Sequence, residues 1–374
     1  MINVLVVDDS AFFRTAISRM LASDPGIQIV GIARDGDEAL EQVRKLKPDV
    51  ITLDIEMPRR DGLSTLQVIM AEMPMPVIMV SSLTVEGAEA TLKALELGAM
   101  DFIPKYQGSS VAHLDVAELS NDLCTKVKAV VSRARRFPIR SRPLGGTFAG
   151  LPSTRTGAPR LTTPPPPPPR VPVAPRPRLR TGRPNRDIVA IGVSTGGPPA
   201  VQKVLSAFPE DFPACIFIAQ HMPGTFTGPF AKRLDNVSRL TVNEAENGDK
   251  IQNGMVYVCP GGKHLRIDMR GALPHLSVVT EPAAALYKPS ASVLMESVGQ
   301  CMGSRSVGVI MTGMGSDGLE GMKILKSKGG VVLAQNEASC VVYGMPKAIV
   351  DAGLADEVVD LEALPDAIMA ALYK

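Results

Sequence analysis

A segment rich in proline and arginine, residues 137–186, divides this chain of 374 residues. It holds 14 Pro, six of them consecutive at residues 164–169, and ten Arg with no Lys, Asp or Glu. Such a segment buries too little apolar surface to form a core, and its prolines favour extended polyproline II. We therefore predict three parts: a folded domain at 1–125, a helix end with a linker at 126–186, and a second folded domain at 187–374.

The net charge of the whole chain is +2, but charge is distributed unevenly along the sequence. The segment 137–186 carries +10, whereas the residues before and after it carry −4 each. Two mildly acidic domains with no Trp and only five Tyr offer neither a basic surface nor many stacking platforms, so we expect no nucleic-acid partner.

Three further patterns concern the cellular location of the chain. The five Cys are scattered and form no C-x-x-C pair, which argues against zinc and disulfides and fits a reducing cytoplasm. The first residues, MINVLVVDDS, lack the basic region of a signal peptide. No apolar run reaches the roughly 20 residues of a membrane helix. We expect a cytoplasmic protein that is not inserted in a membrane.

Both folded domains show apolar runs that alternate with helical patterns, which predicts the α/β class with doubly wound parallel sheets. In the first domain we expect strands at 2–7, 27–32, 49–53, 76–80 and 100–103, and helices at 11–22, 36–46, 62–71, 85–97 and 115–133. In the second we expect strands at 187–193, 215–219, 255–258, 306–311, 330–334 and 356–359, and helices at 197–208, 290–302, 316–327, 344–351 and 361–373. Residues 265–269 and 275–279 predict a small antiparallel hairpin.

Polar residues follow the expected strands of the first domain at the carboxyl edge of the sheet, namely Asp8, Asp9, Asp54, Ser81 and Lys105. Clustered carboxylates repel one another and require a cation, and Mg²⁺ fits a site made of carboxylates, water and phosphate. We expect Asp54 to act as a nucleophile on a phosphoryl group. Lys105 and the Ser81 hydroxyl are then placed to bind the phosphoryl oxygens.

The motifs LVVDDSAFFR, ITLDIEMPRRDG, VIMVSS and DFIPK resemble a two-component response-regulator receiver domain over about residues 1–125. The resemblance implies that Asp54 is phosphorylated by a histidine kinase. It also implies four Mg²⁺ ligands: Asp9 and Asp54 by their side chains, Glu56 by its backbone carbonyl and Asp8 through water. Tyr106 stands where receivers usually have Pro, which leaves the geometry of that loop open.

The second domain places three candidate catalytic residues after three expected strands. Ser194 lies in G-V-S-T-G, the spacing of a nucleophile elbow, between a strand and a helix. His221 follows the next strand, and Asp317 follows the strand near 306–311, so all three reach the same sheet edge. Their order in the chain, Ser–His–Asp, differs from that of the α/β-hydrolases.

A competing motif overlaps this constellation. Residues 313–318, GMGSDG, match G-x-G-x-x-G between a strand and a helix, and Glu337 follows after another strand, which is the pattern of a dinucleotide site. The spacing alone favours neither interpretation. A dinucleotide-dependent oxidoreductase with a receiver domain and a catalytically silent adaptor both remain alternatives.

Six motifs of the second domain resemble the catalytic domain of the CheB family over about residues 187–370: IGVSTGGPPAV, AQHMPGTFT, CPGGKH, YKPSASVLMES, MTGMGSDGLEGM and AQNEASCVVYGMPKAIVDAG. These are chemotaxis response regulators with protein-glutamate methylesterase and glutamine deamidase activity. The resemblance implies Ser194 as nucleophile, His221 as general base and acid, and Asp317 as the orienting carboxylate. It further implies the Met314 amide in the oxyanion hole and Thr195 in support.

The same resemblance implies that the esterase reaction needs no cofactor and that methyl-accepting chemoreceptors are the substrates. It implies that the unphosphorylated receiver packs over the catalytic edge, so phosphorylation of Asp54 activates the esterase; we expect partial inhibition. Two positions depart from the family pattern: Asn336 replaces a common Asp, and Ser292 replaces a common acidic residue.

Overall fold

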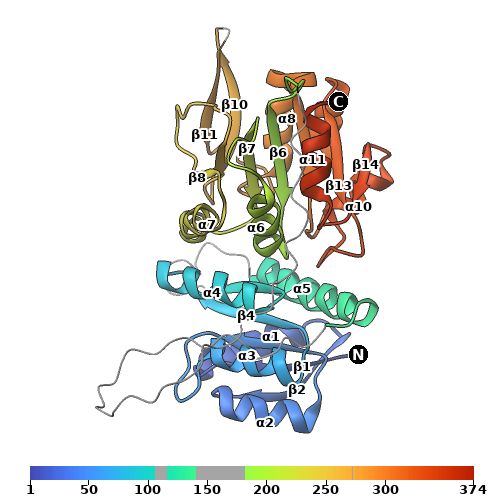
Figure 1. Cartoon of the computed structure of the whole chain (residues 1–374). Coiled ribbons are helices and arrows are strands. Elements are labelled where there is room, and N and C mark those ends of the chain that lie inside the picture. Colours follow the sequence, from blue (N-terminus) through green and yellow to red (C-terminus); the bar gives the residue numbers. More distant parts are fainter. Residues whose placement is uncertain (106–115, 140–181, 272) are drawn as a thin grey trace, which may run out of the picture.

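The computed structural model of this chain describes residues 1–105, 116–139, 182–271 and 273–374. Two α/β domains lie end to end, and two helices of the first domain face the second (Figure 1). Most of the expected linker and the loop that begins at Tyr106 fall outside the described residues.

The first domain is a five-stranded parallel sheet with the order β2-β1-β3-β4-β5. Its strands are β1 (Ile2–Val7), β2 (Ile27–Ala33), β3 (Val50–Asp54), β4 (Val77–Ser82) and β5 (Asp101–Lys105). Its helices are α1 (Ala11–Ala22), α2 (Gly36–Leu46), α3 (Gly62–Glu72), α4 (Val85–Leu97) and α5 (Val116–Arg136). Alternate residues of each central strand face opposite layers, so Val4 and Val6 pack under α1 and α5, whereas Leu5 and Val7 pack under α2, α3 and α4.

The second domain is a seven-stranded parallel sheet with the order β14-β13-β12-β6-β7-β9-β8 and a separate hairpin of β10 and β11. Its strands are β6 (Ile188–Val193), β7 (Cys215–Gln220), β8 (Thr241–Glu244), β9 (Met255–Val258), β10 (His264–Arg270), β11 (Leu273–Val279), β12 (Ser306–Ile310), β13 (Val331–Gln335) and β14 (Glu357–Val359). Its α-helices are α6 (Gly197–Ala207), α7 (Gly224–Val237), α8 (Ala291–Met302), α9 (Leu319–Ser327), α10 (Met345–Asp351) and α11 (Leu364–Leu372). The predicted fold class is confirmed for both domains.

The central strand β6 explains where a ligand can enter this sheet. Val189 and Ile191 face the layer of α6, α7 and α11, and Ile188 and Ala190 face the layer of α8, α9 and α10. From β6 the strand order runs outward in both directions, to β7 on one side and to β12 on the other. Such a switch point opens a crevice at the carboxyl ends of the strands.

Two elements of the second domain were not predicted from the sequence, namely α7 and β8. Helix α7 contains Pro229 in its interior and begins at Gly224, both of which weaken a helical pattern. It forms because Phe226, Phe230 and Leu234 are buried against the sheet. Strand β8 has the mixed sequence TVNE at the edge of the sheet and shows little alternation.

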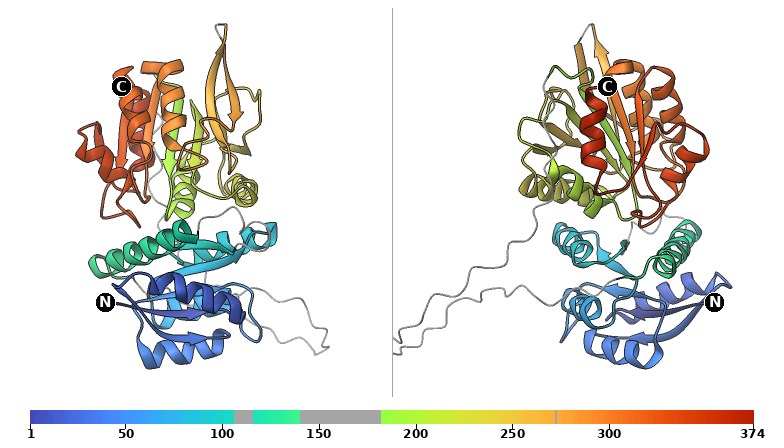
Figure 2. Two further views of the ribbon diagram at one scale, coloured as in Figure 1. Left: turned by 180° about the vertical axis from the view of Figure 1, so that it is seen from behind. Right: turned by 45° about the vertical axis from the view of Figure 1, so that its right-hand side comes forward.

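The first domain meets the second through α4, β5 and α5 (Figure 2). The rings of Phe102 and Phe226 stack across the boundary with centroids 4.8 Å apart. Arg233 donates to Glu96 at 2.9 Å, and Arg133 donates to the carbonyls of Cys340 and Ala338 at 2.6 and 3.1 Å. The boundary is therefore an apolar stack surrounded by charged contacts.

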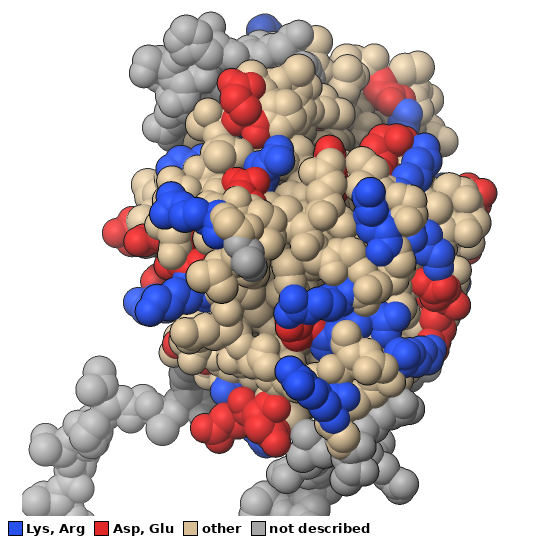
Figure 3. Space-filling model, turned by 90° about the horizontal axis from the view of Figure 1, so that it is seen from above, with Lys and Arg blue, Asp and Glu red and all other residues tan. Residues whose placement is uncertain are grey.

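The end of the molecule away from this boundary carries basic and acidic side chains mixed together (Figure 3). Several of them form ion pairs, including Arg305 with Asp187, Lys326 with Asp356 and Lys374 with Glu357. None of the helices in the described ranges is long and apolar enough to cross a membrane. The five Cys are free thiols.

Candidate active site and phosphorylation site

The acidic residues predicted at the carboxyl edge of the first sheet come together. The carboxylates of Asp8, Asp9 and Asp54 place ligand atoms within 4.8 Å of one another. Asp8 and Asp54 are buried, and Lys105 places its Nζ atom 2.8 Å from Asp8 and 2.7 Å from Asp54. One ammonium group thus faces three carboxylates.

The pKa values of the two buried carboxylates, Asp8 and Asp54, are both shifted. Burial, opposed by Lys105 and reinforced by the charge of Asp8, raises the pKa of Asp54 to about 6. Burial also raises the pKa of Asp8 despite its contact with Lys105. Carboxylates that Lys105 does not fully compensate, set around a gap of ligand size, fit a hard divalent cation such as Mg²⁺.

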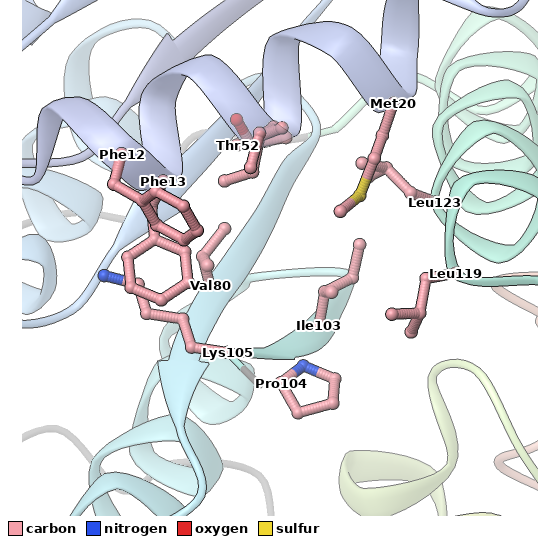
Figure 4. A pocket seen from close by; sticks show the side chains of 12 residues that line it. Phe12, Phe13, Met20, Thr52, Val80, Ile103, Pro104, Lys105, Leu119 and Leu123 are labelled. Carbon is pink, nitrogen blue, oxygen red and sulfur yellow. The ribbon is translucent and has the colours of Figure 1, made fainter. Parts of the chain in front are cut away.

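Ser81 lies beside this cluster, but its hydroxyl does not face it in this structure. The hydroxyl donates to the carbonyl of Gly87 at 3.1 Å, at the start of α4. Lys105 also lies 4.7 Å from the centroid of the Phe13 ring, at one end of an apolar cavity of about 120 Å³ between α1, β5 and α5 (Figure 4). The lining of that cavity is almost wholly apolar.

In the second domain, Ser194 directly follows β6 and precedes α6. Its amide donates to the carbonyl of Thr312, and its own carbonyl accepts from Gly197 and from the side chain of Gln220 at 3.0 Å. Gly196 has a φ of 74° and lies against Val341, where a Cβ atom would come within 2.5 Å. The tight turn predicted from the glycine spacing is therefore present, and glycine is required in it.

His221 and Asp317 form the predicted pair. The Nε2 atom of His221 lies 2.8 Å from Asp317 Oδ2, so this nitrogen carries the proton and donates. The Nδ1 atom is buried and has no hydrogen-bond partner within the described part of the chain. With Nε2 donating to Asp317, Nδ1 is the ring nitrogen left to act as a base.

Asp317 is anchored at the N-terminus of α8. Its carboxylate accepts from the amides of Ala291 at 2.6 Å and Ser292 at 3.0 Å, and from the Ser290 hydroxyl at 2.9 Å. Burial alone would raise the pKa of Asp317, but the hydrogen bonds from His221 and from these amides outweigh it, so the pKa falls well below its ordinary value. The N-terminus of a helix favours an anion because its free amides donate hydrogen bonds and its dipole end is positive.

The two departures from the family pattern lie outside this pair. The Ser292 hydroxyl accepts from the Gly318 amide at 2.7 Å and so supports the loop that carries Asp317. Asn336 accepts from Ser339 and donates to Asp360. Neither position is one of the three candidate catalytic residues.

Ser194, Thr195, His221 and Met314 all line one cavity of about 430 Å³, and Asp101, Phe102, Asp122 and Lys126 of the first domain line its other side. The Thr195 hydroxyl donates to Asp101 at 2.8 Å, across the boundary between the domains. Gly313 lies against Ser194, so close that a Cβ atom would come within 2.8 Å of the Ser194 Cβ atom. Gly313 of the competing motif thus brings the Met314 backbone beside Ser194.

Comparison with known proteins decides between the interpretations left open by spacing. Residues 189–368 match the family model of the CheB methylesterase, and residues 4–114 match that of the response regulator receiver domain. The chain belongs to the CheB methylesterase family. A protein-glutamate methylesterase/protein-glutamine glutaminase of Lawsonia intracellularis is 63% identical over 383 residues, with both chains covered completely.

Other relatives carry the same description. One from Nitratidesulfovibrio vulgaris is 61% identical with both chains covered completely, and one from Pyrococcus abyssi is 43% identical over 99% of this chain and 94% of its own. The dinucleotide interpretation fits poorly with the structure, because Glu337, its candidate ribose ligand, pairs with Arg136 of α5. In this CheB-family chain the glycines serve close backbone packing.

Three residues of the site were not predicted from the sequence. Gln220 donates to the carbonyls of both Ser194 and His221, Asp101 contacts Thr195, and the Tyr287 ring lies on the imidazole of His221. Gln220 precedes His221 directly in the chain, so its position was an available signal. Asp101 and Tyr287 depend on contacts between distant segments.

The anchoring of Asp317 predicts a pH dependence of stability. Its folded-state pKa lies below its unfolded value of about 3.9, so its stabilising effect is complete above that value and is lost as the pH falls. We expect Asp317→Asn to lower the free energy of unfolding by about 1–3 kcal/mol at pH 7 and by less at pH 2.5. Urea unfolding at both pH values measures the difference.

The matched control is Asp268→Asn, because Asp268 lies half-exposed in the hairpin. We expect this change to have little effect at either pH. An Asp317→Asn variant that is destabilised equally at both pH values would contradict the ionised anchoring of Asp317.

Proposed function

We propose that this chain hydrolyses the methyl esters of glutamate side chains, and deamidates glutamine side chains, on methyl-accepting chemoreceptors. The observation that carries the proposal is the His221 imidazole, oriented by Asp317 and placed in one cavity with Ser194. The activities named for the relatives support the substrate class.

The chemistry follows from the orientation of the imidazole. His221 Nδ1 takes the proton of the Ser194 hydroxyl, and Oγ attacks the γ-carbonyl carbon of the ester. Backbone amides at the turn, among them that of Met314, stabilise the oxyanion, while Thr195 supports the turn. Methanol leaves with the proton from Nδ1, and water then hydrolyses the acyl-enzyme by the same proton transfer. With glutamine the leaving group is ammonia, and neither reaction needs a cofactor.

Residues 1–125 are proposed to act as the receiver, residues 126–186 as a helix end and linker, and residues 187–374 as the catalytic domain. A chemotaxis histidine kinase supplies the phosphoryl group, which Asp54 accepts. Asp9 and Asp54 would hold Mg²⁺ by their side chains, Glu56 by its carbonyl and Asp8 through water, and the cation would supply positive charge against the incoming phosphoryl group. We place this chain in the cytoplasm.

Regulation is proposed to act through the face formed by α4, β5 and α5. This face covers the catalytic cavity, and Asp101 accepts a hydrogen bond from Thr195, the neighbour of the nucleophile. Strand β5 carries Asp101 at one end and Lys105, the partner of Asp54, at the other. A phosphoryl group that moves Lys105 therefore acts on the strand that holds the closed face in place.

The esterase proposal predicts that Ser194→Ala abolishes methanol release from methylated receptor membranes, with a loss of at least about 10⁴-fold. The control Ser206→Ala changes an exposed hydroxyl on α6 and should keep the activity. An active Ser194→Ala variant that binds a nicotinamide dinucleotide would support the oxidoreductase alternative, and a wild type without methanol release would support the silent adaptor.

The receiver proposal predicts that acetyl phosphate with Mg²⁺ raises the rate of methanol release roughly 10- to 100-fold, a shift of about 1.4–2.7 kcal/mol between closed and open forms. EDTA and Asp54→Asn should each remove this rise and leave the basal rate. Asp37→Asn, a change at an exposed carboxylate of the same domain, should respond like the wild type. Equal rates with and without the phosphodonor would contradict the proposal.

The contact between Asp101 and Thr195 predicts that Asp101→Ala raises the basal rate. A hydrogen bond to a charged group contributes about 1.5–3 kcal/mol, so we expect an increase of roughly 10- to 100-fold without a phosphodonor. The matched control is Asp122→Ala, because Asp122 lines the same cavity and pairs with Lys126 of its own helix. Equal basal rates in the two variants would show that this contact does not hold the domains closed.

A further inference from the structure

The ring of Tyr287 covers one face of the candidate catalytic imidazole. The two ring centroids lie 4.2 Å apart and the planes differ by 9°, which is a parallel stack. The His221 side chain is only 9% exposed, so this face is closed to solvent. The Tyr287 hydroxyl reaches toward Gly315, where a Cβ atom would lie 3.4 Å from it.

The segment between β11 and α8 therefore contacts both His221 and Asp317. Tyr287 contacts the face of His221, and three residues later Ser290 begins the set of donors that anchors Asp317. Asp317 fixes one edge of the imidazole, and Tyr287 fixes its plane. The direction of the free Nδ1 lone pair depends on both contacts.

The stack also distinguishes the two protonation states of the imidazole. The face of an aromatic ring carries negative charge density, so it attracts an imidazolium more strongly than a neutral imidazole. His221 becomes positively charged as it takes the proton from Ser194. An interaction that strengthens at this step lowers the barrier without tightening the binding of substrate.

The other charged groups near His221 come from several elements. Asp317 and Lys288 belong to the catalytic domain, and Asp101, Asp122 and Lys126 line the cavity from the receiver. Burial, together with the charges of Asp122 and Asp317, raises the pKa of Tyr287, so its hydroxyl stays neutral near pH 7. The receiver groups act on the closed form, and their influence falls when a phosphodonor opens it.

We propose that Tyr287 is a positioning residue that holds the plane of His221 and stabilises its positively charged form during ester hydrolysis. This inference rests on the proposed function, because it requires His221 to be the base. The aromatic ring of Tyr287, rather than its hydroxyl, makes this contribution.

The test compares Tyr287→Phe with Tyr287→Leu in the full chain, opened by acetyl phosphate and Mg²⁺. The substrate is methylated receptor membranes, and methanol release is measured from pH 5 to 9. Ala284→Ser changes an exposed residue of the same segment and serves as the control for damage to the loop. Thermal melting of each variant verifies that it is folded.

We expect Tyr287→Phe and Ala284→Ser to keep the kcat, the KM and the pH profile of the wild type. We expect Tyr287→Leu to lower kcat roughly 3- to 30-fold with little change in KM. Its acid limb of kcat/KM should move to lower pH, because the protonated ring has lost its partner. A residue that only fills space would leave this limb in place.

A second measurement does not depend on turnover. The chain has four His, so the ring protons of His221 can be followed by NMR during a pH titration. We expect their midpoint to move to lower pH in Tyr287→Leu and to stay in place in Tyr287→Phe. Identical pH limbs and NMR midpoints in both variants would overturn the role of Tyr287, whereas an active Ser194→Ala variant would overturn the proposed function itself.

Discussion

The carboxylate of Asp317 lies at the N-terminus of α8, where two helix amides and the Ser290 hydroxyl donate to it. A buried carboxylate without such donors would take up a proton, and then it would no longer orient His221. Because the donors keep it ionised, the Nε2 atom of the imidazole carries a proton and the Nδ1 atom is left without a hydrogen-bond partner among the described residues. The geometry of the reaction thus depends on the place where α8 begins.

The same edge of the sheet explains why the receiver is able to control the esterase. Strand order reverses at β6, so Ser194, His221 and the Asp317 loop meet in a crevice that is open on one side. The face of α4, β5 and α5 lies over that opening, and the stack of Phe102 on Phe226 supplies an apolar contact there. In the proposed function, a substrate side chain reaches Ser194 more readily when this face has moved away.

The sequence predicted those parts of the fold and site that depend on local patterns. The alternation of apolar runs with helical patterns located both sheets, and the ends of the strands located Asp54, Ser194, His221 and Asp317. Helix α7 was not predicted because Pro229 weakens its local pattern, whereas tertiary packing stabilises the helix. Asp101 and Tyr287 were not predicted as site residues because their importance arises from contacts with segments that are distant in the chain.

The strength of the closed state follows from the kinds of contact at the boundary. Exposed ion pairs such as Arg136 with Glu337 contribute about 0–1 kcal/mol each, and the buried hydrogen bond to Asp101 contributes about 1.5–3 kcal/mol. A complete switch from 1:99 to 99:1 requires about 5.5 kcal/mol of differential stabilisation. Because β5 connects Asp101 with Lys105 over five residues, we expect the proposed phosphorylation to act mainly on the strongest of these contacts. The boundary therefore fits partial inhibition, in which a basal rate persists in the unphosphorylated chain.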